Sequence, residues 1–286
     1  MKKKFVVLSL GFLTLAALTV PVPQTHAQED SMAPTVLVTG SNRGLGFHFA
    51  QQFAQAGWNV IATARTPDKA DDLKAVAEEH PNLIIEELDI TDPNEIAALS
   101  KKYSDQPIDV LLNNAARLGE ISRQNFGSID FDLFREILET NVIGSMRVSE
   151  AFVENVAVSD QKKIIVMGSA TGSNEIGHAT PNFYAYRASK AALHFSSAHM
   201  AADFKDRGIA VVLLEPGFAD SRGIMTMRPE DAPDQETREL VEMVQGSGAQ
   251  MQSPAESVAA MIQVIDSVDI EKTGQFLLFD GSTVPY

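Results

Sequence analysis

Short apolar runs alternate with longer amphipathic stretches along most of the chain. The runs are almost entirely apolar, which is typical of parallel strands buried on both faces of a sheet. The pattern therefore predicts an α/β fold with a single doubly wound parallel β-sheet and helices on both faces. The expected strands lie within residues 35–39, 58–64, 82–88, 108–116, 162–170, 209–217 and 275–281, and the first two expected helices are 44–56 and 68–79.

One region interrupts this alternation. Residues 221–252 follow an expected strand and include the irregular segment MRPEDAPDQETREL. Ligands of doubly wound sheets bind at the carboxyl ends of the strands, so a long excursion at such an end is expected to cover a substrate. The alternative is a mobile surface insertion.

The N-terminal residues form a separate unit. Three lysines precede an apolar segment at 5–20, and small residues at Thr25 and Ala27 follow it. This pattern predicts a cleavable export signal at 1–27, cut after Ala27, then a linker at 28–34 and one domain at 35–286. As a helix the apolar segment would span about 24 Å, short of the roughly 30 Å hydrocarbon core of a bilayer. A periplasmic or exported protein is expected, and an uncleaved signal would instead tether it to the inner membrane.

Composition excludes several kinds of site. The 286 residues include 38 acidic and 23 basic side chains, a formal charge of -15 that disfavours nucleic acid and anionic membrane surfaces as partners. The absence of cysteine excludes disulfides, thiolate catalysis and zinc ribbons. The 6 histidines show no HExxH spacing, so no metal site is predicted.

A glycine-rich turn lies between the first expected strand and the first expected helix, in TVLVTGSNRGLG. Glycines there allow a sharp turn and let backbone amides approach a pyrophosphate, which the positive end of the helix also faces. The turn therefore predicts a dinucleotide site. Its expected cofactor-binding residues are Gly40, Ser41, Asn42, Arg43, Gly44, Leu45 and Gly46.

The choice of dinucleotide depends on a position at the end of the second expected strand. NAD-binding domains have an acidic residue there, about 20 positions past the glycines. This chain has Arg65, and Arg43 in the glycine turn adds a second positive charge. Two guanidinium groups suit a 2′-phosphate, so NADP(H) is predicted in preference to NAD. The alternative is that Arg65 only ends a strand at the surface.

The stretch YAYRASK contains two tyrosines and one lysine. Residues four apart share a helix face, so Lys190 belongs with Tyr186, and Tyr184 is rotated away. The ammonium is expected to lower the pKa of the Tyr186 phenol from about 10, which would let it donate or accept a proton. A second donor is expected opposite it, where Ser169 follows a strand, with Ser173 as the alternative.

The spacing TGxxxGxG differs from the general GxGxxG motif and, with YxxxK at 186–190, resembles the short-chain dehydrogenase/reductase family over nearly the whole chain after the signal. TGSNRGLG and YAYRASKAAL look closest to its carbonyl-reductase-like branch. The resemblance implies a Rossmann-type fold and an NADP(H)-dependent oxidoreductase. Such an enzyme transfers hydride between nicotinamide and a carbonyl or alcohol substrate, with Tyr186 as general acid/base and Lys190 also holding the nicotinamide ribose.

The resemblance also implies roles for individual residues. Asn141 would hold a water that links the lysine to solvent, and Ala116 replaces a glycine of the family motif NNAG. Ser221 stands where the family usually has threonine. The implied catalytic residues are Asn141, Ser169, Tyr186 and Lys190. The implied further cofactor contacts are Asp89 and Ile90 at the adenine, Asn113, Asn114 and Ala115 after the fourth strand, and Pro216 and Gly217 beside the nicotinamide.

Other interpretations stay open. A dinucleotide-binding sensor or structural protein would keep the glycine turn without turnover, although it would not need the complete Asn, Ser, Tyr and Lys set. An epimerase or dehydratase of the extended branch is disfavoured by the glycine spacing and the short carboxyl-terminal region. Phe183 and Tyr184 are expected in the substrate-pocket wall or in the core. Family dimers and tetramers pack through the fourth and fifth helices, but monomers occur, so a homo-oligomer is an open expectation.

Overall fold

The computed structural model describes residues 33–177 and 182–286, and there the chain forms one seven-stranded sheet, all of whose strand pairs are parallel, in the order β3-β2-β1-β4-β5-β6-β7. The strands are β1 (Thr35–Val38), β2 (Asn59–Ala64), β3 (Leu83–Glu87), β4 (Val110–Asn113), β5 (Lys163–Met167), β6 (Ala210–Glu215) and β7 (Phe276–Leu278). The α-helices are α1 (Gly44–Gln55), α2 (Asp71–Glu79), α3 (Pro93–Lys102), α4 (Phe131–Leu138), α5 (Ser145–Ala157), α6 (Asn174–Gly177), α7 (Tyr184–Phe204), α8 (Gln235–Ser247) and α9 (Pro254–Asp266).

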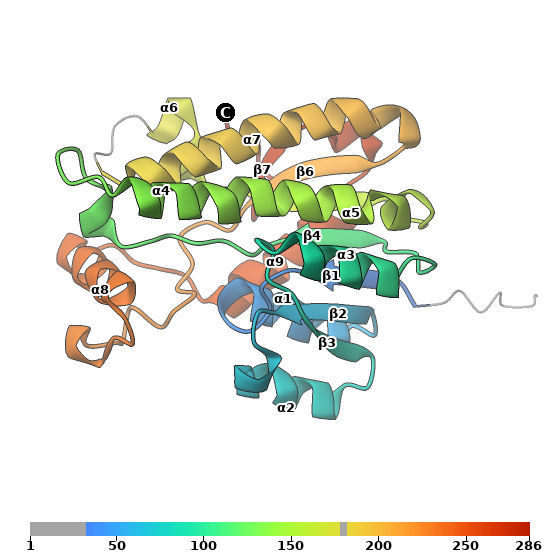
Figure 1. Cartoon of the computed structure of the whole chain (residues 1–286), viewed down its shortest axis with the longest axis horizontal. Coiled ribbons are helices and arrows are strands. Elements are labelled where there is room, and N and C mark those ends of the chain that lie inside the picture. Colours follow the sequence, from blue (N-terminus) through green and yellow to red (C-terminus); the bar gives the residue numbers. More distant parts are fainter. Residues whose placement is uncertain (1–32, 178–181) are drawn as a thin grey trace, which may run out of the picture. The chain divides into compact units, whose positions relative to one another are not determined.

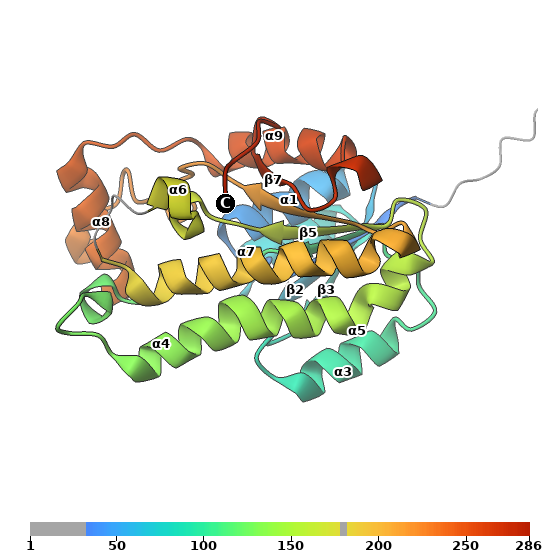
Figure 2. The same ribbon diagram turned by 90° about the horizontal axis from the view of Figure 1, so that it is seen from above.

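The strands are buried because helices cover both faces of the sheet (Figures 1 and 2). Side chains alternate between the faces along each strand. In β1, Val36 and Val38 belong to the apolar cluster shared with α1, α2 and α9, whereas Leu37 belongs to the cluster shared with α3, α5 and α7. Figure 2 shows α7 beside α4 and α5 on one side of the sheet, with α1 and α9 on the other. The predicted doubly wound, Rossmann-type fold is confirmed.

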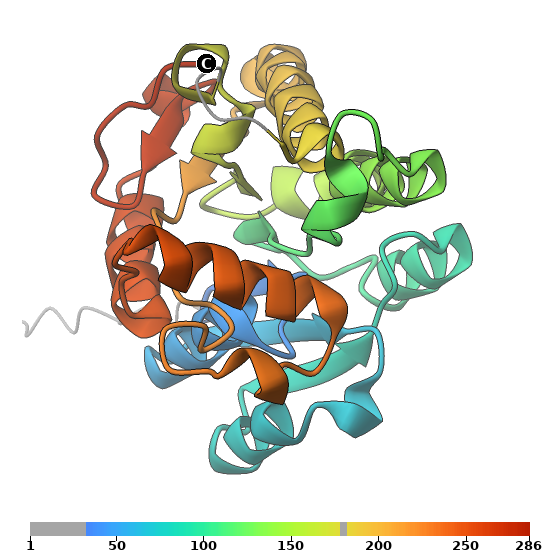
Figure 3. The same cartoon turned by 90° about the vertical axis from the view of Figure 1, so that its left-hand side faces the viewer.

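The strand order reverses between β1 and β4. The chain runs outward from β1 to β2 and β3, and then returns to β4 on the other side of β1. In open parallel sheets this switch point leaves a crevice beyond the carboxyl ends of the strands, where ligands bind. Figure 3 views the molecule from that end, with α8 lying across it.

The excursion at 221–252 is more regular than the sequence suggested. It contains the 13-residue helix α8, which begins where the Asp234 side chain accepts a hydrogen bond from Thr237 N–H. Ile224, Val241 and Val244 are buried together in a small apolar cluster of their own. The segment, here called the flap (residues 218–252), is therefore a packed subdomain.

The predicted export signal and most of the linker at 28–34 lie outside the described residues. Within the described ranges, none of the helices has the length and apolar character that crossing a bilayer requires.

Candidate active site

The glycine turn after β1 is tightly packed. Gly40 and Gly44 have φ of 70° and 59°, in the left-handed region that favours glycine. A Cβ on Gly46 would lie 2.5 Å from Nδ2 of Asn114 and closer still to the carbonyl oxygen of Gly40. That Nδ2 donates to the carbonyl oxygens of Thr39 and Gly40, at 2.8 and 3.1 Å. Asn114 thus secures the turn from the end of β4.

The turn forms one end of a cavity of about 1100 Å³. Helix α1 begins there with its N-cap residue Arg43 extended, and within the described residues no side chain caps it and no acidic residue occupies its first turn. The positive end of the helix dipole therefore faces the cavity without a competing acid. The space and the exposed amide end fit the pyrophosphate of a dinucleotide.

In the part of the chain that the structure describes, five arginines line the same cavity. Arg43 and Arg65 were predicted, whereas Arg117, Arg135 and Arg222, the last from the flap, were missed by the sequence reasoning. Burial and then the charge of Arg222 lower the pKa of Arg43. Arg222 is itself paired with Glu236 at 2.5 Å, and both side chains are largely buried. The cavity therefore contains a dense group of positive charges that flap carboxylates partly balance.

The other predicted cofactor contacts divide into two groups. Most line the cavity, whereas Ser41 is buried and donates to the Val38 carbonyl oxygen, and Asn113 donates to Ser149 Oγ. Gly217 is packed against Gln252 and Phe279 rather than lining the cavity. The predicted contacts that line the cavity are Gly40, Asn42, Arg43, Gly44, Leu45, Gly46, Arg65, Asp89, Ile90, Asn114, Ala115, Tyr186, Lys190 and Pro216.

Tyr186 lies on the cavity wall in the first turn of α7, and the Ser169 side chain acts on its phenol by lowering the pKa. Ser169 Oγ is also hydrogen-bonded to Thr171 Oγ1 at 2.9 Å. The alternative serine, Ser173, is buried, and its Oγ accepts the backbone N–H groups of Glu175 and Ile176. Only Ser169 therefore stands as the partner of the phenol. Residues 178–181, between Ser173 and Tyr186, lie outside the described residues.

Lys190 lies beside Tyr186, as the helical spacing predicts, with Nζ 5.7 Å from the ring centroid. It is buried, and Nζ donates to the Met167 carbonyl oxygen at 2.9 Å. Burial lowers its pKa to about 8, although the Glu215 carboxylate acts in the opposite direction.

The predicted direction of the Tyr186 pKa is wrong for this structure. Burial, followed by the negative charge of Glu215, raises that pKa to about 12, against the opposing effects of Ser169 and Arg222. The cause is desolvation, which disfavours phenolate more than the Ser169 side chain and the Arg222 charge favour it.

Asn141 is buried where α4 and α5 join in a π-helical turn, Glu139–Gly144. Its Oδ1 accepts Arg117 N–H at 2.7 Å, and its Nδ2 donates to Arg117 O and to Ser189 Oγ, each at 2.9 Å. Ser189 Oγ in turn donates to the Tyr186 carbonyl oxygen. The wider π turn thus lets one amide join the cavity wall to the start of α7.

Tyr184 is rotated away from this group. Its side chain is 46% exposed, its ring centroid is 6.0 Å from that of Phe126, and it does not line the cavity. Neither expected position for Tyr184, the pocket wall or the core, is found in this structure, and Phe183 does not line the cavity either.

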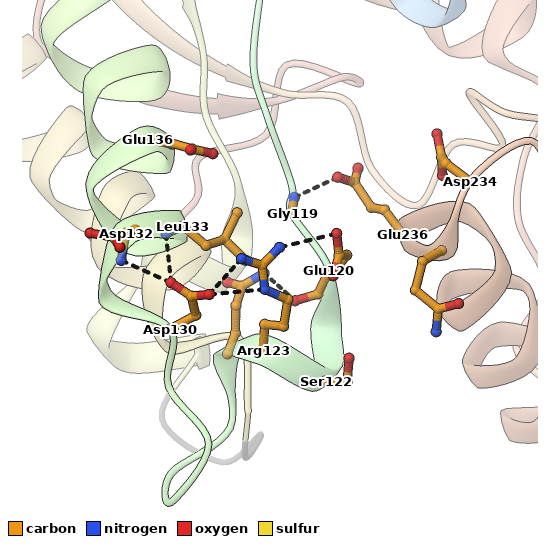
Figure 4. A network of polar contacts seen from close by, with 12 residues as sticks. Gly119, Glu120, Ser122, Arg123, Asp130, Asp132, Leu133, Glu136, Asp234 and Glu236 are labelled. Carbon is orange, nitrogen blue, oxygen red and sulfur yellow. Dashed lines mark hydrogen bonds and ion pairs between the residues drawn. The ribbon is translucent and has the colours of Figure 1, made fainter.

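The flap is joined to the opposite cavity wall by acidic side chains of α8. Glu236 Oε2 accepts Gly119 N–H at 2.9 Å, and Glu239 accepts both the N–H and the hydroxyl of Ser122. Figure 4 shows Glu236 directed at Gly119, with the Arg123–Asp130 ion pair nearby. At the other end of the flap, Ser221 contacts Gly44, so the flap spans the cavity mouth.

Comparison with known proteins agrees with this geometry. A model of the short chain dehydrogenases matches residues 34–232, and the chain therefore belongs to the short-chain dehydrogenase/reductase family of oxidoreductases. An uncharacterized oxidoreductase of Schizosaccharomyces pombe is 29% identical over 257 residues, which cover 87% of this chain and 96% of the relative.

Two solved structures are also similar. The NADPH-bound carbonyl reductase from chicken fatty liver has a TM-score of 0.74 and 26% identity over 89% of this chain and 99% of its own. A short-chain dehydrogenase/reductase from Burkholderia multivorans with bound NADP has a TM-score of 0.71 and 30% identity over 89% of this chain and all of its own. The predicted resemblance to the family, and to carbonyl reductases within it, is confirmed.

Sequence reasoning missed three side chains near the reacting groups: Arg222, Glu215 and His194. Arg222 lies in the segment expected to cover the substrate, so its place there was a usable signal. Glu215 directly precedes Pro216 at the end of a buried strand, where an acidic residue is unusual. His194 lies four residues after Lys190, on the same helix face.

Proposed function

We propose that this protein is an NADP(H)-dependent carbonyl reductase in which Tyr186 donates the proton to the carbonyl oxygen. The observation that carries the proposal is the position of the Tyr186 hydroxyl. Tyr186 stands beside Lys190 on the wall of the cavity that the glycine turn also lines, and the Ser169 side chain acts on its phenol. A reducible group that enters the cavity meets a proton donor and a dinucleotide-sized space together.

The chemistry follows from the charge that develops during reduction. Bound NADPH supplies a hydride, and the carbonyl oxygen then gains negative charge. Tyr186 and Ser169 offer two hydroxyls to that oxygen, and Lys190 places a positive charge beside the phenol. Its pKa of about 12 keeps Tyr186 protonated at neutral pH, so the phenol holds the proton that carbonyl reduction requires, and it is a weaker acid than a free phenol. We place Asn141 as the support of this group, and its role in a water relay stays a prediction.

The residues fit NADP(H). The amides at the start of α1 and the small residues 40, 44 and 46 would hold the pyrophosphate. Arg43 and Arg65 line the same cavity and would hold the 2′-phosphate through charge-assisted hydrogen bonds. The NADP or NADPH bound in the two similar structures supports this preference.

The function is tested by turnover. Purified protein is mixed with NADPH and a panel of aldehydes and ketones, and NADPH consumption is followed. Consumption that depends on one class of carbonyl supports a reductase. Tight NADPH binding with no turnover across the panel, in either direction of reaction, would favour a dinucleotide sensor instead.

The cofactor preference is tested at the two arginines. We expect Arg65→Gln and Arg43→Gln each to weaken NADPH binding about tenfold, since each removes one charge-assisted contact, and to leave NADH binding nearly unchanged. Dissociation constants from fluorescence titration give the measurement. Arg207→Gln is the control, because Arg207 pairs with Glu154 away from the cavity. Equal losses of affinity for NADPH and NADH would contradict the role of Arg43 and Arg65 at the 2′-phosphate.

We also propose that the protein is exported, from the basic and apolar pattern of its first 27 residues. Expression of the full chain followed by N-terminal sequencing should give a mature protein that begins at Gln28. An intact N-terminus in the membrane fraction would instead support the inner-membrane tether.

A further inference from the structure

The backbone that carries Ser169 leaves the sheet at the end of β5. The last residues paired between β5 and β6 are Met167 and Leu214, and Gly168 N–H still donates to the Leu214 carbonyl oxygen at 2.9 Å. The next two backbone N–H groups donate to side chains instead. The segment next to the proposed catalytic serine therefore depends on side-chain acceptors for its position.

The two acceptors come from different elements. Ser169 N–H donates to Nε2 of His194 on α7, at 3.2 Å. Ala170 N–H donates to Oε2 of Glu215 at the end of β6. Both acceptor side chains are buried, with 2% of His194 and 7% of Glu215 exposed. In such surroundings an unmade hydrogen bond is costly, so these two bonds hold the Ser169–Ala170 backbone from two sides.

His194 continues the helix face that carries the reacting groups. It follows Tyr186 by eight residues and Lys190 by four, so α7 presents a phenol, an ammonium and an imidazole in one row. The imidazole fits under Gly168, where an added Cβ would lie 3.3 Å from Nε2, and its ring centroid is 4.6 Å from that of Phe276. Burial and the Lys190 charge lower the His194 pKa to about 4, so Nε2 is free to accept at neutral pH.

We propose that His194 and Glu215 are positioning residues of the reaction, which hold the Ser169–Ala170 backbone so that the Ser169 hydroxyl meets Tyr186. The inference rests on the proposed reductase function and deepens it. His194 is not among the residues that line the cavity, and neither is Glu215, so both act through the serine.

Glu215 has a second effect through its charge. The Gly217 N–H lowers the pKa of the Glu215 carboxyl group, and Glu215 interacts electrostatically with both Tyr186 and Lys190. The negative charge raises the pKa of both groups and so helps to keep them protonated. The other charged groups that act on Tyr186 are Arg222 and Glu236 of the flap. Burial raises the pKa of Glu215 itself to about 7.

A double-mutant cycle tests the role of His194. We expect His194→Leu to lower kcat about 10- to 100-fold, because a misaimed Ser169 hydroxyl no longer supports the phenol, and to leave the NADPH dissociation constant within about twofold. His194→Gln, which keeps an acceptor near Nε2, should recover most of kcat. In the Ser169→Ala background, His194→Leu should have little further effect. His199→Leu is the control, on the same helix but at an exposed position.

The outcomes separate the two proposals. If the parent protein reduces no carbonyl, the proposed function fails, whatever the variants show. If the parent is active and His194→Leu keeps its kcat, or the effects of Ser169→Ala and His194→Leu simply multiply, the positioning role is wrong. Equal loss in the Leu and Gln variants would also overturn it. Should His194→Leu not fold, the same cycle is run with His194→Asn, whose shorter amide does not reach Ser169 N–H.

The pH profile tests the role of Glu215. Reduction by the parent should decline above about pH 8, where Lys190 loses its proton. Glu215→Gln keeps an oxygen acceptor but removes the charge, so the pKa values of Tyr186 and Lys190 should fall and this alkaline limb should move to lower pH. Glu256→Gln, an exposed position on α9, is the control. An unmoved or upward-shifted limb in Glu215→Gln would contradict the electrostatic role.

Discussion

Replacing Tyr186 with phenylalanine is expected to lower kcat for carbonyl reduction by about 10²- to 10⁴-fold, the usual contribution of a positioned acid or base. The substitution removes one hydroxyl and keeps the ring. The cofactor contacts at the glycine turn and at Arg65 are untouched, so the NADPH dissociation constant should stay within about twofold of the parent value. Turnover with the preferred carbonyl and a separate fluorescence titration with NADPH give the two measurements.

Tyr184→Phe is the matched control for this experiment. It makes the same chemical change two residues earlier on the same helix, but the Tyr184 side chain is 46% exposed and is rotated away from Lys190. It should retain kcat. A Tyr186→Phe protein that reduces carbonyls at the parent rate would remove the basis of the proposed mechanism, and equal losses in both variants would point to an effect on the start of α7.

Replacing Gly46 with alanine is expected to give the largest loss of stability among small substitutions in the glycine turn. The added Cβ would lie 2.5 Å from Nδ2 of Asn114 and closer still to the Gly40 carbonyl oxygen, so the turn must open. Such overpacking costs about 1–3 kcal/mol. Because the same turn lines the cofactor cavity, NADPH binding should weaken as well. Urea denaturation gives the free energy of unfolding, and an NADPH titration gives the affinity.

Gly246→Ala is the control, because Gly246 is also inside a helix but a Cβ there meets no atom within 4 Å. Alanine is the better helix former, so this variant should gain about 0.5–1 kcal/mol in the free energy of unfolding. Opposite signs for the same substitution would show that packing against Gly40 and Asn114 decides the result. A Gly46→Ala protein as stable as the parent and with the parent's NADPH affinity would show that close packing at Gly46 does not shape the cofactor site.

Most of the fold could be predicted from the sequence because it depends on local patterns. Every predicted strand contains one of the seven observed strands, since nearly continuous apolar runs are stable only between two layers of helices. The helix α8 was not predicted. Its signal was short, an Asp234 cap before Leu240, Val241 and Val244, and it lies in a segment rich in proline and acidic residues. Its packing with Ile224 and the hydrogen bonds of Glu236 and Glu239 to Gly119 and Ser122 are tertiary contacts that the sequence does not reveal.

The part of the candidate site that the sequence predicted correctly is the part that depends on helix geometry alone. Lys190 lies beside Tyr186 because four residues make about one helical turn. The choice between Ser169 and Ser173 was harder. The number of residues between each serine and Tyr186 does not determine how far apart they lie in the fold. In the structure Ser169 acts on the phenol of Tyr186, whereas Ser173 accepts hydrogen bonds from the first backbone N–H groups of α6.

What the sequence by itself determined is the set of local features: the strand and helix pattern, the glycine turn, the shared face of Tyr186 and Lys190, and the family to which these belong. The tertiary structure alone decided the pKa of Tyr186 and the side chains that hold the backbone near Ser169. It placed the half-buried phenol near Glu215, where desolvation reversed the expected direction of the Tyr186 pKa, and it placed His194 under the serine backbone. The physical reason is that desolvation and long-range hydrogen bonds depend on which groups the fold packs together. The local pattern of apolar and polar residues does not contain this information.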